Sequence, residues 1–144
     1  MKCMDKHGFE QQNVFGTGAA NTAYARFFIG QSFLNPLTDP KTGLFLANVT
    51  FEPAAATTGI STRGQGRRPA AGLHRRRRLV PGRGKTAVSL TPGTVITIPA
   101  NVKHWHGAKA DSWFSHIAVE VPGKDCSNEW CEPVTDEEYA KLNG

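Results

Sequence analysis

The stretch PGTVITIPANVKHWHG, residues 92–107, decides the fold because it combines two turns, a short apolar strand and two histidines. His104 and His106 are spaced i, i+2, so on a strand their side chains share one face and Trp105 takes the other. Two imidazoles on one face of a strand suit a transition metal. The structural alternative is one solvent-facing histidine and one buried histidine bonded to the backbone.

The sequence around this stretch predicts further short strands separated by turns. Arg26 to Leu34 is rich in Phe and Ile, and Gly43 to Phe51 alternates apolar residues with small or polar ones. Between them, Asn35 to Pro40 has typical turn residues. Val88–Leu90 and Thr94–Ile98 are predicted to form a strand pair around the intervening Pro-Gly turn.

A longer strand is predicted from Trp113 to Val121. Its two faces carry different residues: Phe114, His116, Ala118 and Glu120 on one, and Trp113, Ser115, Ile117 and Val119 on the other. Thr135-Asp136-Glu137-Glu138 is a capping box, which predicts a short helix through Leu142. Many short strands, the turns between them and one terminal helix predict an all-β barrel or sandwich.

The order Gly93, Pro99 and His104 resembles the second sequence motif of the cupin family, in which this histidine is a metal ligand. The usual glycine two residues after the proline is Asn101 here, and asparagine also tolerates a left-handed turn conformation. A closer resemblance is to single-domain carboxymuconolactone-decarboxylase-like cupins, a group that includes manganese-dependent hydroxynitrile lyases. It is carried by Val102–Gly107, Trp113–Ala118 and Glu129-Trp130. The resemblance implies one cupin domain over residues 1–144, a double-stranded β-helix or jelly-roll barrel.

The resemblance also implies a site and a chemistry. His104 would be a metal ligand, and His106 or His116 would move a proton as general base or acid. The metal of the related cupins, a divalent Mn, Fe, Co, Ni or Zn ion, would act as a Lewis acid on a substrate oxygen. Nearby aromatic residues would supply packing or pocket walls: Trp105, Trp113 and Phe114. The implied function is a metal-dependent, commonly homodimeric lyase or decarboxylase-like enzyme for a small-molecule substrate, and the alternative is a non-catalytic cupin that binds a small ligand.

The segment Arg63–Gly84 differs abruptly from the rest of the chain. It holds 8 arginines, 5 glycines, 2 prolines and 2 alanines among its 22 residues. No Asp or Glu occurs between Glu52 and Asp111, and no Phe, Tyr or Trp occurs between Phe51 and Trp105. The chain's net charge of +5 becomes −3 when the 8 arginines are removed, so the basic character belongs to this segment alone.

Three interpretations of this segment compete. The first is a polyanion-binding patch around Arg75–Arg78. It lacks the aromatic platforms on which bases stack, so we expect no nucleic-acid partner. The second is a flexible basic insertion in a cupin loop. The third is an out-of-frame translation of the first cupin motif, which in the family supplies an H-x-H pair and a Gln or Glu as further metal ligands.

Back-translation with chosen synonymous codons favours the third interpretation. Thr57–Thr62 read two bases later gives Asn-Trp-His-Ile-His. Arg67–Ala71 read one base later gives Gly-Gly-Gln-Leu-Leu, and Leu79–Arg83 gives Trp-Tyr-Gln-Glu-Glu. Of the four family ligands only His104 then remains, and a single imidazole does not hold a divalent ion. We expect residues 54–84 to disrupt the barrel, either as an irregular basic loop over an open barrel or by preventing stable folding.

Length and composition set the remaining bounds. A chain of 144 residues is expected to form one domain. No apolar run reaches membrane-spanning length and the first residues form no apolar signal segment, so we expect a cytoplasmic protein with no membrane contact. The three cysteines are too few and too irregularly spaced for a disulfide framework.

Overall fold

The computed structural model describes residues 4–65, 67–71, 77–81, 88–120 and 124–140, with side chains for residues 4–61, 88–120 and 127–140. The strands are β1 (Ala19–Ala20), β2 (Phe28–Ile29), β3 (Ser32–Pro36), β4 (Phe45–Phe51), β5 (Ala56–Thr57), β6 (Ile60–Gln65), β7 (Arg67–Ala71), β8 (Arg77–Pro81), β9 (Val88–Leu90), β10 (Val95–Pro99), β11 (His104–Ala108), β12 (Phe114–Glu120) and β13 (Lys124–Trp130). The helices are α1 (Lys6–Gln12), η1 (Ala25–Phe27), η2 (Pro40–Thr42) and α2 (Asp136–Ala140).

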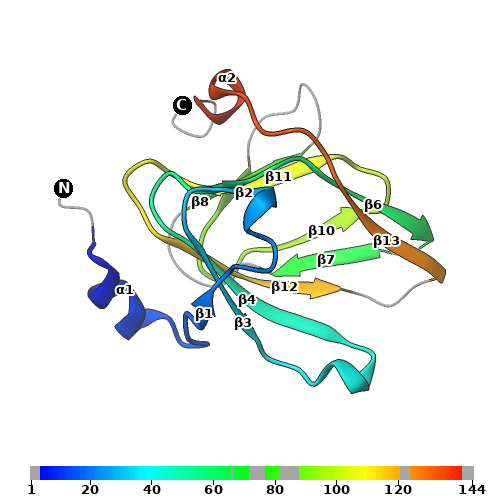
Figure 1. Cartoon of the computed structure of the whole chain (residues 1–144), viewed down its shortest axis with the longest axis horizontal. Helices are drawn as coiled ribbons and strands as arrows, with labels where there is room; N and C mark the ends of the chain where they lie inside the picture. Colours follow the sequence, from blue (N-terminus) through cyan, green and yellow to red (C-terminus); the bar gives the residue numbers. More distant parts are fainter. Residues whose placement is uncertain (1–3, 66, 72–76, 82–87, 121–123, 141–144) are drawn as a thin grey trace.

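Within these residues the strands form two antiparallel sheets that face each other (Figure 1). One sheet has the order β1-β3-β4-β12-β7-β10. The other has the order β13-β6-β11-β5-β2, with β8 pairing β11 and β9. Two facing sheets of short antiparallel strands make a jelly-roll barrel, so the all-β prediction is confirmed. Among the described residues, no helix is both long and apolar enough to cross a membrane.

The centre of the barrel is built by β4 and β12, which pair along their whole length. Phe114 lies opposite Phe51, and His116 lies opposite Val49. Since side chains alternate along a strand, these four face inward. Phe51 and Phe114 are almost completely buried, at 0% and 1% exposed, and belong to the main apolar cluster. The inward face of these two strands therefore carries both core residues and His116, the histidine predicted to move a proton.

The outward face of the same two strands carries a buried polar network under the N-terminal segment. Asn48 donates to the Asn13 side-chain oxygen at 2.9 Å and to the Gly16 carbonyl at 2.7 Å, and it accepts from the Ser115 hydroxyl at 2.6 Å. Asn13 donates in turn to the hydroxyl of Thr50 at 3.3 Å. Each buried amide thus finds partners, as buried polar groups must. The network joins the segment after α1 to the outside of the sheet.

The prediction of an irregular loop over residues 54–84 is wrong for much of the segment. β7 lies between β12 and β10, and β8 lies between β11 and β9. Backbone hydrogen bonding between strands does not require apolar side chains, so a basic composition did not keep these residues out of the sheets. Arg63–Gln65 end β6, and residues 66, 72–76 and 82–84 of the Arg-rich segment, among them Arg75 and Arg76, lie outside the described residues.

The predicted pairing of the two strands around the Pro-Gly turn is also wrong. β9 pairs with β8 in one sheet, whereas β10 pairs with β7 in the other. The turn between them is tight, since the Thr94 N–H donates to the Thr91 carbonyl at 2.9 Å and Gly93 has φ +86°. It carries the chain from one sheet to the other. Asn101 has φ +64°, the left-handed conformation expected from its place in the motif.

The C-terminal helix is confirmed over its described residues. The Glu138 N–H donates to the Thr135 hydroxyl at 3.2 Å, which is the cap predicted from the sequence. Tyr139 then donates to the Ala108 carbonyl at 2.8 Å, and its ring lies 6.1 Å from that of Trp105. The helix α2 is thereby fixed to the outside of β11 (Figure 1). The residues after Ala140 lie outside the described part of the chain.

Candidate functional site

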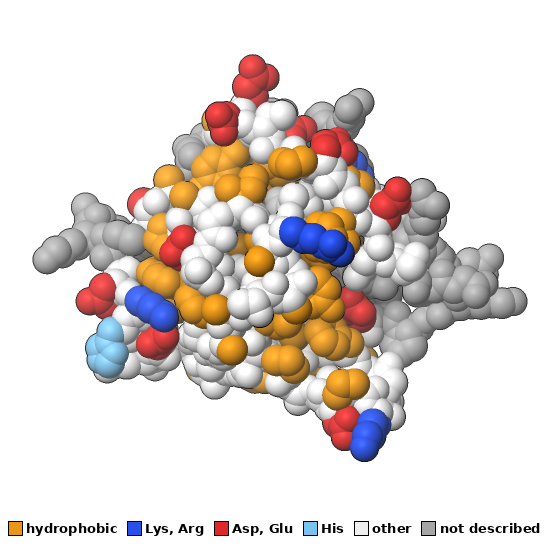
Figure 2. All heavy atoms as spheres, in the orientation of Figure 1, with side chains coloured by type: hydrophobic (Ala, Val, Ile, Leu, Met, Phe, Trp, Pro, Cys, Tyr) orange, Lys and Arg blue, Asp and Glu red, His pale blue; other side chains and the backbone are white. Residues whose placement is uncertain are grey.

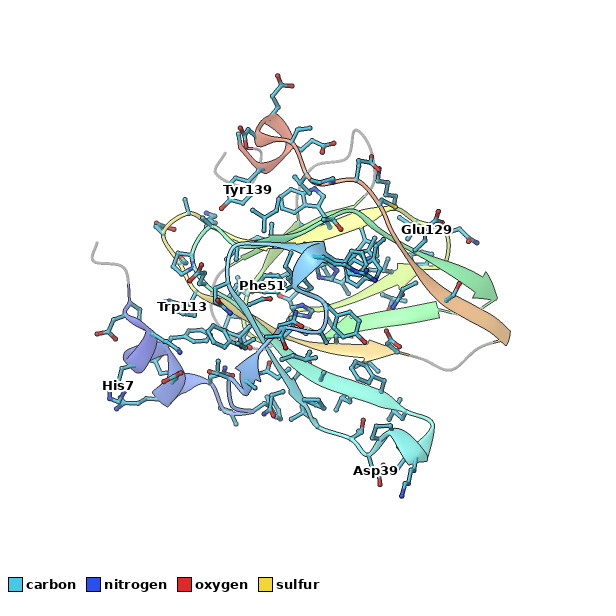
Figure 3. The ribbon with its side chains drawn as sticks, in the orientation of Figure 1. His7, Asp39, Phe51, Trp113, Glu129 and Tyr139 are labelled. Carbon is cyan, nitrogen blue, oxygen red and sulfur yellow. The ribbon has the colours of Figure 1, made fainter. Side chains whose placement is uncertain are left out.

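A cavity of about 340 Å³ occupies the space between the two sheets. Its walls are mostly apolar and aromatic, with a few polar groups, as is usual for small-molecule sites. The polar and ionisable side chains lining it are Asn21, Tyr24, Thr57, His104, His106, His116, Glu120 and Asn128. The largest apolar ones are Phe28, Leu34, Phe45, Phe51, Ile60, Ile98 and Trp130. Phe51 lies near the middle of the barrel in Figure 3.

The structure brings the three histidines predicted from the sequence together in this cavity. His104 and His106 both face it from β11, with ring centroids 5.1 Å apart. His116 reaches in from β12 in the opposite sheet and stacks on His106 at 5.0 Å and 26°. Trp105 points the other way and packs near α2. The predicted alternation of faces is confirmed on β11 and at His116 of β12, whereas Val119, predicted on the other face of β12, also lines the cavity.

Two of the predicted aromatic residues lie on opposite sides of β12. Phe114 packs inward, with its ring 5.3 Å from that of His116. Trp113 faces outward and stacks on Phe9 of α1 at 5.5 Å (Figure 3). Of the two, Phe114 therefore supports the site, whereas Trp113 holds the N-terminal helix.

The hydrogen bonds of the histidines differ. His104 Nδ1 lies 2.9 Å from the Val102 carbonyl, which can only accept, so Nδ1 is assigned the proton. The backbone N–H of His106 donates to the Thr57 hydroxyl at 3.1 Å. His106 Nδ1 is buried and has no hydrogen-bond partner among the described residues. An unsatisfied buried polar atom costs about 1–3 kcal/mol, so a ligand that bonds to it would be stabilised.

Burial keeps two of these rings neutral. It lowers the pKa of His106 well below 6.5, and the nearby His116 and His104 lower it further. Burial also lowers the pKa of His116 from 6.5 to about 4; a backbone hydrogen bond with Ile117 opposes this shift and His104 adds to it. Both imidazoles are therefore uncharged near pH 7. Each can accept a proton through one nitrogen and donate through the other.

The lowered pKa of His116 predicts a loss of stability in acid. Unfolding releases this ring to a pKa near 6.5, so the unfolded chain binds more protons between pH 6.5 and 4. We expect its contribution to the free energy of unfolding to be constant above pH 7 and to fall by roughly 2–3 kcal/mol by pH 4.5. Urea unfolding at a series of pH values measures this. His116→Phe should remove that part of the pH dependence, whereas His7→Gln, at an exposed histidine, should leave it; equal curves for all three proteins would contradict the prediction.

The described residues do not fit a metal ion. They contain no group of three His, Cys, Asp or Glu residues placed to hold one. The stacking of His106 on His116 agrees with this, because ring nitrogens direct their lone pairs in the ring plane and two stacked rings do not point at a common centre. That His104 is a metal ligand stays a prediction.

Sequence reasoning missed the aromatic residues at one end of the cavity. Tyr24 precedes η1, Phe28 lies in β2, and Trp130 ends β13, yet all three line the same space. The only sequence signal among them is Glu129-Trp130, which carries part of the family resemblance and does not indicate a pocket. On the face shown in Figure 2, Lys and Arg side chains of the described residues are scattered singly and form no basic patch.

Comparisons with known proteins agree with the fold. No family model matches the chain. An (R)-mandelonitrile lyase from Granulicella tundricola is 32% identical over 129 residues, covering 88% of this chain and 95% of the lyase. A cupin-like protein from Thermotoga maritima has a crystal structure that superposes with a TM-score of 0.72 at 32% identity, covering 90% of this chain and 96% of that one.

A more distant structure shows the fold alone. It is a cupin-2 domain protein from Rhodospirillum rubrum, with a TM-score of 0.55 at 18% identity over 86% of this chain and 78% of its own. None of these three relatives bears the name of a carboxymuconolactone decarboxylase, so that part of the resemblance gains no support, and neither does an out-of-frame origin of the Arg-rich segment. The fold and two relatives at 32% identity over nearly their whole length establish that this chain belongs to the cupin superfamily.

Proposed function

We propose that this cupin is a small-molecule lyase that cleaves a bond next to a hydroxyl-bearing carbon, as in a cyanohydrin. The observation that carries the proposal is His106 Nδ1, a buried polar atom with no partner among the described residues, in a cavity that also holds two further imidazoles. A hydroxyl group both donates and accepts, so it satisfies this nitrogen in either tautomer of the ring. The mandelonitrile lyase similar to this chain supports the choice of reaction.

The proposed step needs one base and one exit for the leaving group. A neutral imidazole of His106 or His116 takes the hydroxyl proton. The O–H electron pair becomes the second bond of a carbonyl group, and the bond from the same carbon to cyanide breaks with its electron pair on cyanide. The imidazolium then returns its proton to cyanide, so aldehyde and hydrogen cyanide leave and the ring is neutral again. The apolar walls keep water from competing for the proton.

One observation favours a second function, a non-catalytic cupin that binds a small ligand. Burial lowers the pKa of His116 to about 4, and a base this weak gains little by taking a proton near pH 7. The same cavity, with its neutral hydrogen-bonding groups and apolar walls, is well suited to binding without reaction.

Turnover of (R)-mandelonitrile separates these two functions. Purified full-length protein is mixed with the cyanohydrin at mildly acidic pH, where uncatalysed decomposition is slow, and release of benzaldehyde is followed. Release above the uncatalysed rate, saturable in substrate, is the result expected for a lyase. Calorimetric binding without release would support the ligand-binding function, and the absence of both would show that neither proposal is right.

We also propose that the parent protein of this chain bound a metal through an intact first cupin motif, as metal-dependent cupins do. A shift of reading frame would have removed that motif from this chain. The support is positional: the shifted His-Ile-His would fall at residues 60–62, and Ile60 of β6 lies opposite His104 of β11 and lines the cavity. The nucleotide sequence of codons 50–90 in the source gene tests this. Three additional bases spread through the stretch would support a lost motif, and DNA matching the chain as written would overturn it.

A further inference from the structure

A continuous row of aromatic rings runs along the cavity wall, from one end to the histidines. Trp130 lies 6.1 Å from Phe28, Phe28 lies 5.6 Å from Phe51, and Phe51 lies 5.8 Å from His116 between ring centroids. All four line the cavity. The row therefore connects Trp130 with the histidines, where His106 presents its unpartnered nitrogen.

Trp130 is held in place from behind. Phe27 stacks on it at 4.5 Å with only 5° between the ring planes, and the Arg26 guanidinium lies 4.6 Å from the centroid of Phe27. Tyr24 adds a further tilted contact to Trp130 at 6.3 Å. A ring supported on one face by another ring is rigid, so little side-chain conformational entropy is lost when a ligand binds against it.

We propose that Trp130 and Phe28 form a ring-binding subsite, the aromatic wall, which selects ligands carrying one aromatic ring joined through a single carbon to a hydroxyl group. The ring would lie against the aromatic wall and the hydroxyl would reach the nitrogens of His106 and His116. This inference rests on the proposed function in one respect: it places the ligand in the same cavity. A volume of about 340 Å³ is at the lower end for small-molecule sites, which suits one ring and one short substituent.

Aromatic ligands are favoured over aliphatic ones of equal size for a physical reason. Burial of apolar area is nearly the same for a phenyl and a cyclohexyl group. Edge-to-face and offset contacts between rings add about 0.5–1.5 kcal/mol beyond area burial. At 25 °C this corresponds to a preference of about 2- to 12-fold in Kd for each well-formed ring contact.

Calorimetric titration of the full chain with benzyl alcohol and with cyclohexylmethanol tests the subsite. We expect wild-type protein to bind benzyl alcohol more tightly by at least the 2-fold lower limit of that range. Trp130→Leu should reduce the preference, because it keeps an apolar side chain and loses one of the two rings of the aromatic wall, and Trp130→Phe should restore most of it. Trp113→Phe is the matched control, since Trp113 stacks on Phe9 outside the barrel and should leave the preference unchanged.

Equal Kd values for the two alcohols in wild-type protein, or no binding of either, would overturn the subsite. So would an unchanged preference in Trp130→Leu. Circular dichroism and the Trp130→Phe variant guard against a folding defect in the leucine variant. Binding is measured without turnover, so a preference found in a protein that releases no benzaldehyde supports the aromatic wall and contradicts only the lyase. Turnover of the cyanohydrin together with equal Kd values for the two alcohols would support the lyase and contradict the aromatic wall.

Discussion

Replacing Phe51 by alanine is expected to lower the free energy of unfolding by about 3–5 kcal/mol, the range for removal of a buried phenylalanine ring. Phe51 is 0% exposed and lies at the end of β4, where its ring contacts those of Phe28, Phe114 and His116. The partners come from two different strands, β2 and β12, so they cannot all move to fill the space that the ring leaves. A whole domain is stable by only about 5–15 kcal/mol, so this one change removes a large share.

Urea unfolding followed by circular dichroism measures this loss. Phe15→Ala is the matched control, because Phe15 is 38% exposed and follows α1 at the surface. We expect the control to change the free energy of unfolding by less than about 1 kcal/mol. A similar small change for Phe51→Ala would show that the two sheets do not pack around this ring as the structure describes.

The second large effect concerns the proposed reaction. His106→Phe is expected to reduce turnover by about 10²- to 10⁴-fold, the usual contribution of a general acid or base. Phenylalanine keeps a flat ring of similar size stacked on His116 and beside the tilted ring of His104, and removes both nitrogens. Folding near pH 7 should therefore persist, since a neutral ring is replaced by an apolar one. The rate constant kcat should fall. The Kd for benzyl alcohol should rise by no more than the loss of one hydrogen bond explains.

His116→Phe, assayed beside it, identifies which of the two rings takes the proton. The ring that acts as base should show the larger loss of kcat, and the other should act mainly on KM. His7→Gln serves as the control because His7 is exposed on α1, far along the chain from the cavity residues. If both phenylalanine variants keep wild-type turnover, neither imidazole is the base, and the proposed proton transfer is wrong.

The histidine end of the site could be predicted from the sequence because it depends only on local alternation. His104 and His106 on one strand, and His116 among apolar residues on another, fix which side chains face inward. That His104, His106 and His116 belong to one site followed from the resemblance and not from periodicity. The stacking of His106 on His116 depends on ring orientation, and no sequence pattern encodes that.

The other end of the cavity could not be predicted, for a different reason. Phe28 and Trp130 are far apart in sequence and belong to short or terminal stretches of strand, where alternation is too brief to assign a face. The pairing of β9 and β10 was mispredicted because a Pro-Gly turn suits a hairpin and a crossing between sheets equally well. The basic composition of the Arg-rich segment predicted a loop where the structure has strands. Backbone pairing with β10, β11 and β12 does not depend on the side chains.

The polar network outside β4 has a consequence for the order in which the protein is made. Asn48 leaves the ribosome early, but its partner Ser115 follows 67 residues later, and β12 must arrive before β4 is paired on both sides. Until then the side-chain oxygen of Asn48 lacks the hydroxyl of Ser115 and can accept only from water. Contacts this distant along the chain slow folding, since a long loop must close first. During synthesis, the edge of β4 that later pairs with β12 therefore stays unpaired until β12 has been made. Unpaired strand edges are prone to aggregation, so a chaperone that binds unfolded chains would act mainly in that interval.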